Sequence, residues 1–303
     1  MALPYGIIPV LQTPFDDAGA VDRDSLSRLV EDAIAARVDG FLYPAVASEV
    51  AWLSPSERSD LLRHVVATIN GRVPVIAGAS SPDAEVSRNL CRESQQIGAT
   101  ACLIAVPPAC YAAPATTVPF FEQAAKDCAL PLVIQDLEFN GPGLSLDTMQ
   151  ALADALPSLA GWKIETVPSG PKYTAVRNLF GSSCHISGGW AVAQLIEALD
   201  RGVDAMIPEA SMVRVYHAIY SAYMAGHRDE ALRLFRLLLP VIAYTNQEIV
   251  TSIAFFKRLL VRKEIFRTET LRWPGFHWDP FNTRIADELI SHCLAIEGSL
   301  DVE

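Results

Sequence analysis

The sequence lacks a hydrophobic run long enough to cross a membrane, because no stretch approaches about 18 uninterrupted apolar residues. Its first residues also lack the cationic and apolar regions of an export signal. We therefore expect no membrane partner and a cytoplasmic location. Basic residues are scarce as well: 24 Lys and Arg oppose 35 Asp and Glu, which gives a net charge of −11. Such a chain has no basic field to attract phosphates, so no nucleic-acid partner is expected.

Paired cysteines and nucleotide-binding loops are also missing. The six cysteines form no C-x-x-C pair and no cysteine–histidine cluster with the spacing of a zinc site. We interpret them as reduced, mostly buried thiols. Neither G-x-G-x-x-G nor G-x-x-x-x-G-K-[ST] stands at a strand-to-helix junction. The sequence thus predicts no bound metal and no other cofactor.

Hydrophobic residues, by contrast, make up half of the 303 positions, and only 19% are charged, which indicates a large buried core. Eight short apolar runs with β propensity alternate with amphipathic, helix-like stretches. This alternation predicts an α/β fold, a (β/α)8 TIM barrel, and an open doubly wound sheet is the alternative. The predicted strands are Gly6–Leu11, Gly40–Pro44, Val73–Ala77, Ala101–Val106, Leu132–Gln135, Gly161–Ile164, Cys184–Ser187 and Ala205–Pro208.

The pattern becomes purely helical after the eighth predicted strand. Three further helices are predicted, at His227–Tyr244, Gln247–Glu264 and Pro280–Glu297. We therefore expect residues 1–226 to form the barrel. Residues 227–303 are expected to form a C-terminal appendix of three helices that packs on it.

Lys163 has an unusual position for a lysine. It lies within a predicted barrel strand, and the two-residue alternation points it into the barrel while Trp162 and Ile164 face the helices. Burial there favours a neutral amine, which can attack a ketone and form a Schiff base. The alternative is a structural ion pair with Glu165, two residues later on the same face. The other four lysines are expected at the surface: Lys126, Lys172, Lys257 and Lys263.

Several segments resemble the dihydrodipicolinate synthase / N-acetylneuraminate lyase family of class I, pyruvate-dependent aldolases. The resemblance runs in order along essentially the whole chain, including the helical tail. It rests on Gly6–Phe15, Val38–Glu49, Arg72–Gly78, Gly98–Pro108, Gly161–Lys163, Ser187–Gly189 and Gly202–Ile207. It implies the barrel fold, a small-molecule 2-oxo acid as substrate, and assembly as a homotetramer or homodimer.

The resemblance also implies roles for single residues, and the sequence departs from the family pattern at some of them. Lys163 takes the place of the lysine that condenses with the 2-oxo acid. A tyrosine that relays protons is expected at the end of the fifth strand, where this chain has Gln135, and a glutamine is no proton acid near neutral pH. Tyr111 offers a phenol after the fourth strand, one step from the expected place.

The substrate-binding positions follow from the same resemblance. Ala47 and Ser48 occupy the segment that binds the substrate carboxylate, where the expected pair of hydroxyls is reduced to Ser48. Asn140 stands where some members hold a second carboxylate with an arginine. Three further candidates are Glu165 beyond the lysine, Gly188 after the seventh strand and Ile207 in the eighth.

These departures argue against dihydrodipicolinate synthesis itself. The sequence predicts a lyase, either an aldolase or a hydro-lyase, that acts on a 2-oxo acid through a Schiff base on Lys163. Protons would be relayed by Tyr111, Glu165, Asp136 or a water held by Gln135. The alternative is a catalytically impaired family member that binds or senses a small molecule. A barrel enzyme with metal or phosphate chemistry is disfavoured, because no cluster of His, Asp and Glu stands at the strand ends.

Overall fold

Eight parallel strands form one curved sheet in the computed structural model, which describes residues 3–189 and 192–300. The strand order is β1-β8-β7-β6-β5-β4-β3-β2, and a parallel bridge from Val10 to Leu42 closes the ring between the first two strands. The strands are β1 (Gly6–Ile7), β2 (Phe41–Tyr43), β3 (Val75–Gly78), β4 (Ala101–Ala105), β5 (Leu132–Leu137), β6 (Leu159–Glu165), β7 (His185–Gly188) and β8 (Ala205–Met206).

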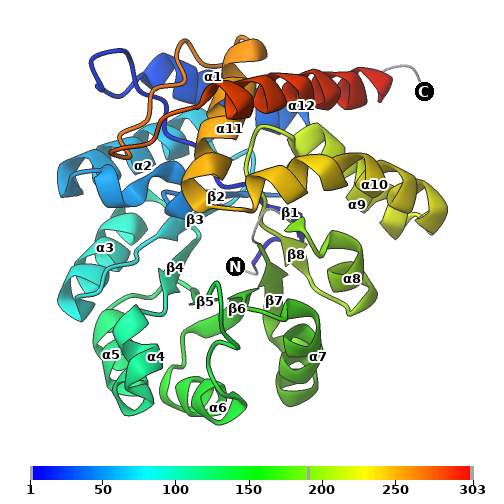
Figure 1. The fold of residues 1–303 in the computed structure, drawn as a ribbon. Helices are drawn as coiled ribbons and strands as arrows, with labels where there is room; N and C mark the ends of the chain where they lie inside the picture. The colour runs from blue at the N-terminus through cyan, green and yellow to red at the C-terminus, as the bar shows by residue number, and fades with distance from the viewer. Residues whose placement is uncertain (1–2, 190–191, 301–303) are drawn as a thin grey trace.

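Helices surround this ring, as Figure 1 shows in a view down the barrel. The helices are α1 (Arg23–Ala35), α2 (Pro55–Ile69), α3 (Ala84–Ile97), α4 (Pro108–Ala112), α5 (Thr117–Ala124), α6 (Leu146–Ala155), α7 (Ser169–Phe180), α8 (Leu195–Asp200), α9 (Val213–Met224), α10 (Arg228–Thr245), α11 (Ile249–Arg262) and α12 (Pro280–Ser299). Short 3₁₀ turns are η1 (Val46–Ser48), η2 (Val50–Trp52), η3 (Pro114–Thr116) and η4 (Gly181–Ser183). The predicted (β/α)8 fold class is confirmed.

The first strand is shorter than its apolar run because prolines interrupt it. Pro9 has no N–H to donate, so the regular ladder of β1 ends before it. The extended chain nevertheless stays attached to its neighbours: the Val10 N–H donates to the Pro208 carbonyl at 2.7 Å, and the Leu42 N–H donates to the Pro9 carbonyl at 3.0 Å. The predicted run Gly6–Leu11 is therefore correct in direction, although only its beginning is regular strand.

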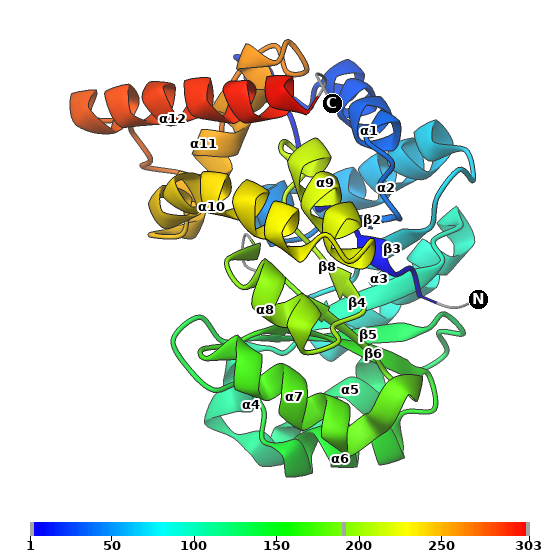
Figure 2. The ribbon, with the colours of Figure 1, turned by 90° about the vertical axis from the view of Figure 1, so that its right-hand side faces the viewer.

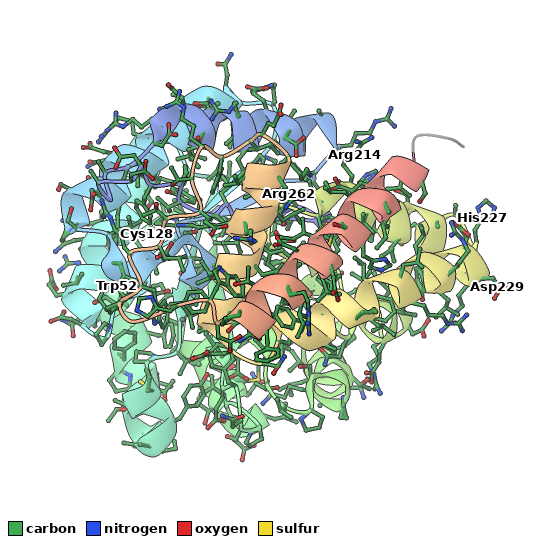
Figure 3. All side chains as sticks on the ribbon, turned by 45° about the horizontal axis from the view of Figure 1, so that its top comes forward. Trp52, Cys128, Arg214, His227, Asp229 and Arg262 are labelled. Atoms are coloured by element: carbon green, nitrogen blue, oxygen red, sulfur yellow. The ribbon has the colours of Figure 1, made fainter. Side chains whose placement is uncertain are left out.

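The three C-terminal helices lie on one side of the barrel. Figure 2 places α10, α11 and α12 on the side opposite the N-terminus, and Figure 3 shows α12 lying beside α10 and α11. An ion pair between Arg258 of α11 and Asp287 of α12, at 3.0 Å, joins two of them. The division into residues 1–226 and 227–303 stays a prediction.

Among the described residues, no helix combines the length and the apolar composition that crossing a bilayer requires.

Three of the lysines that were expected at the surface are in fact paired inside the protein. Lys257 is fully buried and forms an ion pair with Glu49, while its Nζ also donates to the Thr270 carbonyl at 2.9 Å. Lys263 pairs with Glu297 at 3.0 Å and is mostly buried. Lys172 donates to the carbonyls of Pro142, at 3.0 Å, and of Leu144. Helix amphipathicity failed as a guide for Lys257 and Lys263 because glutamates from distant segments meet these two amines.

The buried pair of Lys257 and Glu49 gives a stability prediction. Changing Lys257 to methionine should lower the free energy of unfolding by about 3–5 kcal/mol, because the Glu49 carboxylate would stay buried without its cation. Urea unfolding measures this change. The double variant Lys257→Met/Glu49→Gln should recover at least half of the loss, since a glutamine oxygen still accepts the N–H groups of Arg272 and Trp273. A double variant as unstable as the sum of the single changes would contradict this account.

Candidate active site

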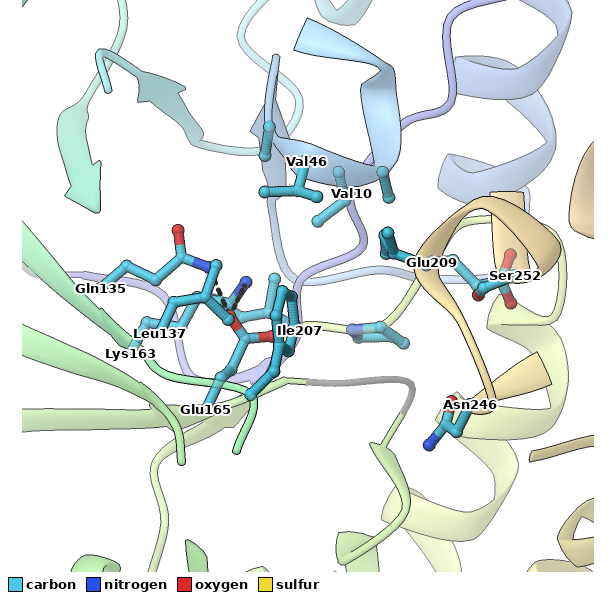
Figure 4. A pocket seen from close by; sticks show the side chains of 15 residues that line it. Val10, Val46, Gln135, Leu137, Lys163, Glu165, Ile207, Glu209, Asn246 and Ser252 are labelled. Atoms are coloured by element: carbon cyan, nitrogen blue, oxygen red, sulfur yellow. Dashed lines mark hydrogen bonds and ion pairs between the residues drawn. The ribbon is translucent and has the colours of Figure 1, made fainter. Parts of the chain in front are cut away.

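A cavity opens at the carboxyl ends of the strands, where the C-terminal helices approach the barrel (Figure 4). The cavity has a volume of about 60 Å³, counted as the space that the centre of a water molecule can reach. One water needs roughly 10–15 Å³ counted in the same way, so the cavity can hold several waters or the head of a small substrate. It is lined by Val10, Ala45, Val46, Ala47, Gln135, Leu137, Phe139, Lys163, Glu165, Ile207, Pro208, Glu209, Asn246, Ile249 and Ser252.

Strand β6 carries Lys163 into this cavity. Its neighbours Trp162 and Ile164 belong to the apolar layer between sheet and helices, and Trp162 stacks on Phe180 at 5.9 Å. The predicted alternation is therefore correct. Lys163 is 4% exposed, and its Nζ lies 3.0 Å from Oε2 of Glu165. The structure thus shows the ion pair that was considered as an alternative, but it places that pair beside an open cavity.

Gln135, Lys163 and Glu165 form a compact group at the base of the cavity. The register of β5 and β6 sets Gln135 opposite Lys163, and Gln135 Nε2 donates to the same Glu165 oxygen that pairs with the lysine. All three side chains are buried. The Lys163 amine and the Gln135 amide thus contact the same oxygen of Glu165. These two contacts hold that oxygen close to any group bonded to Nζ.

The absence of a side chain at Gly189 leaves room for Lys163 and Glu165. A Cβ at this position would stand 2.1 Å from Oε1 of Glu165 and 2.9 Å from Cε of Lys163. Any side chain here would displace the carboxylate. The two side chains thus occupy the space that a side chain at position 189 would fill.

Changing Gly189 to alanine should lower the turnover rate about 10- to 100-fold, because misplacing a reacting group by about 1 Å costs a factor of this size. Steady-state kinetics measures the effect. The control is Gly298→Ala, where the added methyl group meets open space and turnover should stay unchanged. Gly202 is unsuitable as a control, because its φ of +72° would strain an alanine. Full activity in Gly189→Ala would show that the Glu165 carboxylate has room to move.

The segment after β2 contributes three lining residues to the cavity. Ala45, Val46 and Ala47 line the cavity at the start of η1, where the first N–H groups of a helical turn have no acceptor within that turn. The Ser48 hydroxyl points elsewhere: it donates to the Leu11 carbonyl at 2.6 Å and accepts from the Ala45 N–H at 3.0 Å. Of the two predicted positions, the structure brings Ala47 to the cavity and uses Ser48 to hold the loop.

Tyr111 and Asn140 lie outside the lysine cavity. Both line a separate hollow together with Pro108, Leu137, Glu138 and Phe139. The Tyr111 hydroxyl donates to Asp136 at 2.9 Å, and burial together with this carboxylate raises the pKa of Tyr111 above its usual value. Burial also raises the pKa of Asp136. Within this chain, neither the tyrosine nor Asp136 is placed against Lys163, and their predicted roles stay predictions.

Gly188 and Ile207 lie on neighbouring strands. The Ile207 N–H donates to the Gly188 carbonyl at 2.8 Å, and Ile207 forms part of the cavity wall. Gly188 does not line the cavity. A Cβ there would stand 2.5 Å from the Tyr173 hydroxyl, so this glycine makes room for the packing behind the strand.

The C-terminal region supplies cavity residues that sequence reasoning missed. Asn246, Ile249 and Ser252 come from the junction of α10 and α11 and from the start of α11, and Figure 4 shows Asn246 and Ser252 across the cavity from Lys163. No local pattern marks them, because the tail has only helical periodicity. Glu209, at the end of the last strand, also lines the cavity, although its carboxylate accepts from Gln12 at 2.9 Å and Tyr216 at 3.0 Å.

The fold and site define a class of enzyme: a (β/α)8 barrel of the class I aldolase and lyase type, with a buried lysine at the carboxyl ends of the strands. The sequence model of the Dihydrodipicolinate synthetase family matches residues 3–281. The chain belongs to this family.

Individual relatives agree with this assignment. The chain is 29% identical over 276 residues to L-2-keto-3-deoxyarabonate dehydratase of Azospirillum brasilense, which covers 89% of this chain and 88% of the relative. It is 32% identical over 245 residues to 4-hydroxy-tetrahydrodipicolinate synthase of Rhizobium meliloti, covering 78% and 81%. The solved 4-hydroxy-tetrahydrodipicolinate synthase of Methylacidiphilum fumariolicum superimposes with a TM-score of 0.87 at 23% identity, covering 98% of both chains, and supports the fold.

Proposed function

We propose that this protein is a lyase that binds a pyruvate-type 2-oxo acid as a Schiff base on Lys163. The observation that carries the proposal is the Lys163 amine, buried beside an open cavity and within 3.0 Å of a carboxylate. Attack of Nζ on the C2 carbonyl expels water and leaves an iminium ion. That ion accepts the electron pair released when a proton leaves C3 or when the C3–C4 bond breaks.

Glu165 is the group we assign to proton transfer. It is the carboxylate nearest to Nζ, and it shares one oxygen with Lys163 and Gln135. Gln135 positions this oxygen and does not itself exchange protons. A carboxylate so close to the imine nitrogen can take the proton lost as the imine forms and return it later. This assignment replaces the tyrosine that the family resemblance places at the end of the fifth strand.

The substrate carboxylate is assigned to the start of η1. Val46 and Ala47 line the cavity at the first turn of this segment, where N–H groups have no acceptor within the turn and can donate to an anion. Lys163 is the only cation among the described cavity residues, and a Schiff base uses its nitrogen. A second carboxylate on the substrate would find no positive partner, which argues against dihydrodipicolinate synthesis.

The part of the substrate beyond C3 should be uncharged. The walls there are mostly apolar, with Leu137, Phe139, Ile207 and Ile249, and Asn246 and Ser252 offer neutral hydrogen-bonding groups. Aldol cleavage and loss of water share the iminium intermediate, and both fit this cavity. The similarity to an L-2-keto-3-deoxyarabonate dehydratase supports dehydration of a 2-oxo acid with an uncharged polyhydroxy chain as the first reaction to assay.

The experiment is reductive trapping of the wild-type protein. Incubation with pyruvate or a panel of neutral-chain 2-oxo acids and borohydride should add one substrate mass, and peptide mapping should place it on Lys163. An adduct without turnover on any panel member would instead favour the impaired family member that only binds its ligand. No adduct with any member would overturn the proposal.

Assembly as a homotetramer or homodimer is also proposed, and it rests on the family resemblance. Tyr111 would then have a role in a neighbouring site, since it does not reach Lys163 of its own chain. Light scattering coupled to gel filtration measures the assembly, and a monomer would remove this role. The cytoplasmic location stays a prediction.

A further inference from the structure

Three cysteines from separate elements meet behind the sheet. Cys91 lies in α3, Cys102 in β4, and Cys128 in the connection between α5 and β5. Their sulfur atoms all lie within 4.8 Å of one another, although the residues are up to 37 positions apart in the sequence. All three are free thiols. The spacing of the three cysteines along the chain matches no metal-binding motif, so only the fold brings them together.

The sulfur separations are compatible with ligands of a single metal ion. Three thiolates around a tetrahedral ion with metal–sulfur bonds of about 2.3 Å stand about 3.8 Å apart. Small side-chain movements would bring these sulfurs to that separation. Within the described residues, no histidine or carboxylate completes the group, so a fourth position is left for water. Cys128 is half-buried, whereas Cys91 and Cys102 are buried, and water can therefore enter on the Cys128 side.

The elements that carry the three cysteines already touch at this point. The Cys102 thiol donates to the Cys91 carbonyl, with 3.9 Å between the sulfur and the oxygen, so α3 and β4 meet directly beside the group. Next to Cys128, Asp127 forms an ion pair with Arg88 of α3, which holds the connection after α5 against that helix.

We propose that Cys91, Cys102 and Cys128 form a binding site for a thiophilic divalent cation of the zinc type, with water as the fourth ligand. The ion binds the three sulfurs as thiolates, and each cysteine that is a thiol beforehand releases its proton to solvent as its metal–sulfur bond forms. The ion would join α3, β4 and the connection after α5. None of these residues lines the lysine cavity, so the proposal is independent of the proposed reaction.

The test is titration of the reduced, metal-free full-length protein with Cd²⁺, followed by the ultraviolet absorption of cadmium–thiolate bonds. Saturation is expected at one equivalent, and Zn²⁺ should remove the signal by competition. Proton release, followed with an indicator dye in weak buffer, should accompany binding. Thermal unfolding should shift upward with Zn²⁺, because an ion that binds only the folded chain stabilises it.

Single alanine variants assign the ligands. Cys128→Ala should weaken Cd²⁺ binding by at least about 100-fold, and so should Cys91→Ala and Cys102→Ala. The matched control is Cys293→Ala, a buried cysteine in α12 outside the group, and it should bind as the wild type does. If the two fully buried variants do not fold, Cys128→Ala decides alone. Absence of saturable binding in the wild type, or equal binding in Cys128→Ala, would overturn the proposal.

Discussion

Replacing Lys163 with methionine should abolish reductive trapping of a 2-oxo acid and lower turnover by at least about 10⁴-fold, since no other amine lines the cavity among the described residues. Methionine fills a similar volume without the amine, so the barrel interior stays packed. The Glu165 carboxylate remains hydrogen-bonded to Gln135. Mass spectrometry after borohydride treatment and steady-state kinetics measure the two effects.

A second buried lysine makes this test specific. Burial lowers the pKa of Lys257 to about 8, so part of it is a neutral amine near pH 8 and chemically able to condense with a carbonyl. However, its Nζ is occupied by Glu49 and the Thr270 carbonyl, and it does not line the cavity. The wild-type adduct should therefore map to Lys163 and be missing from the Lys257 peptide. Trapping that persists in Lys163→Met would assign the chemistry to another amine.

Changing Glu165 to glutamine should separate imine formation from turnover. The glutamine keeps the size of the side chain but cannot accept a proton, so turnover should fall about 10²- to 10⁴-fold. Trapping of the substrate on Lys163 should still occur, since the amine remains in place. Single-turnover measurements with and without borohydride distinguish the two steps.

The matched control is Glu138→Gln. Glu138 follows the same strand as Gln135, and its carboxylate accepts from the Gly143 N–H at 2.7 Å, outside the lysine cavity. Turnover in this variant should stay within about twofold of the wild type. Equal losses in Glu138→Gln and Glu165→Gln would show a general effect of acidic residues. Unchanged turnover in Glu165→Gln would move proton transfer to another group.

The placement of Lys163 was predictable because strand alternation is a local rule. Once Leu159–Glu165 is recognised as a strand, Trp162 and Lys163 must face opposite sides, and an amine directed into a barrel has few structural explanations. Glu165 follows from the same parity. The eight strands and the tail helices were likewise readable from periodicity and from helix caps such as Ser54, which forms a capping box with Glu57.

The remaining site residues depend on contacts that sequence position does not reveal. Ser48 has the correct location, yet its hydroxyl is used by the Leu11 carbonyl, 37 residues away. The Tyr111 hydroxyl donates a hydrogen bond to Asp136 on the outer face of β5, and this bond directs it away from Lys163. The cavity residues of the tail, such as Asn246, reach the site only because α10 and α11 pack at the mouth of the barrel.

Glu49 connects the segment after β2 to the C-terminal tail. This residue directly follows η1, which borders the cavity, and its carboxylate accepts hydrogen bonds from Lys257, the Arg272 N–H and the Trp273 N–H. The loop at the cavity and the tail segments that carry these three residues are thus held together. Exchanging the tail for that of a relative would therefore alter what the enzyme accepts, and a barrel cut off before α11 would lose its ability to select a substrate.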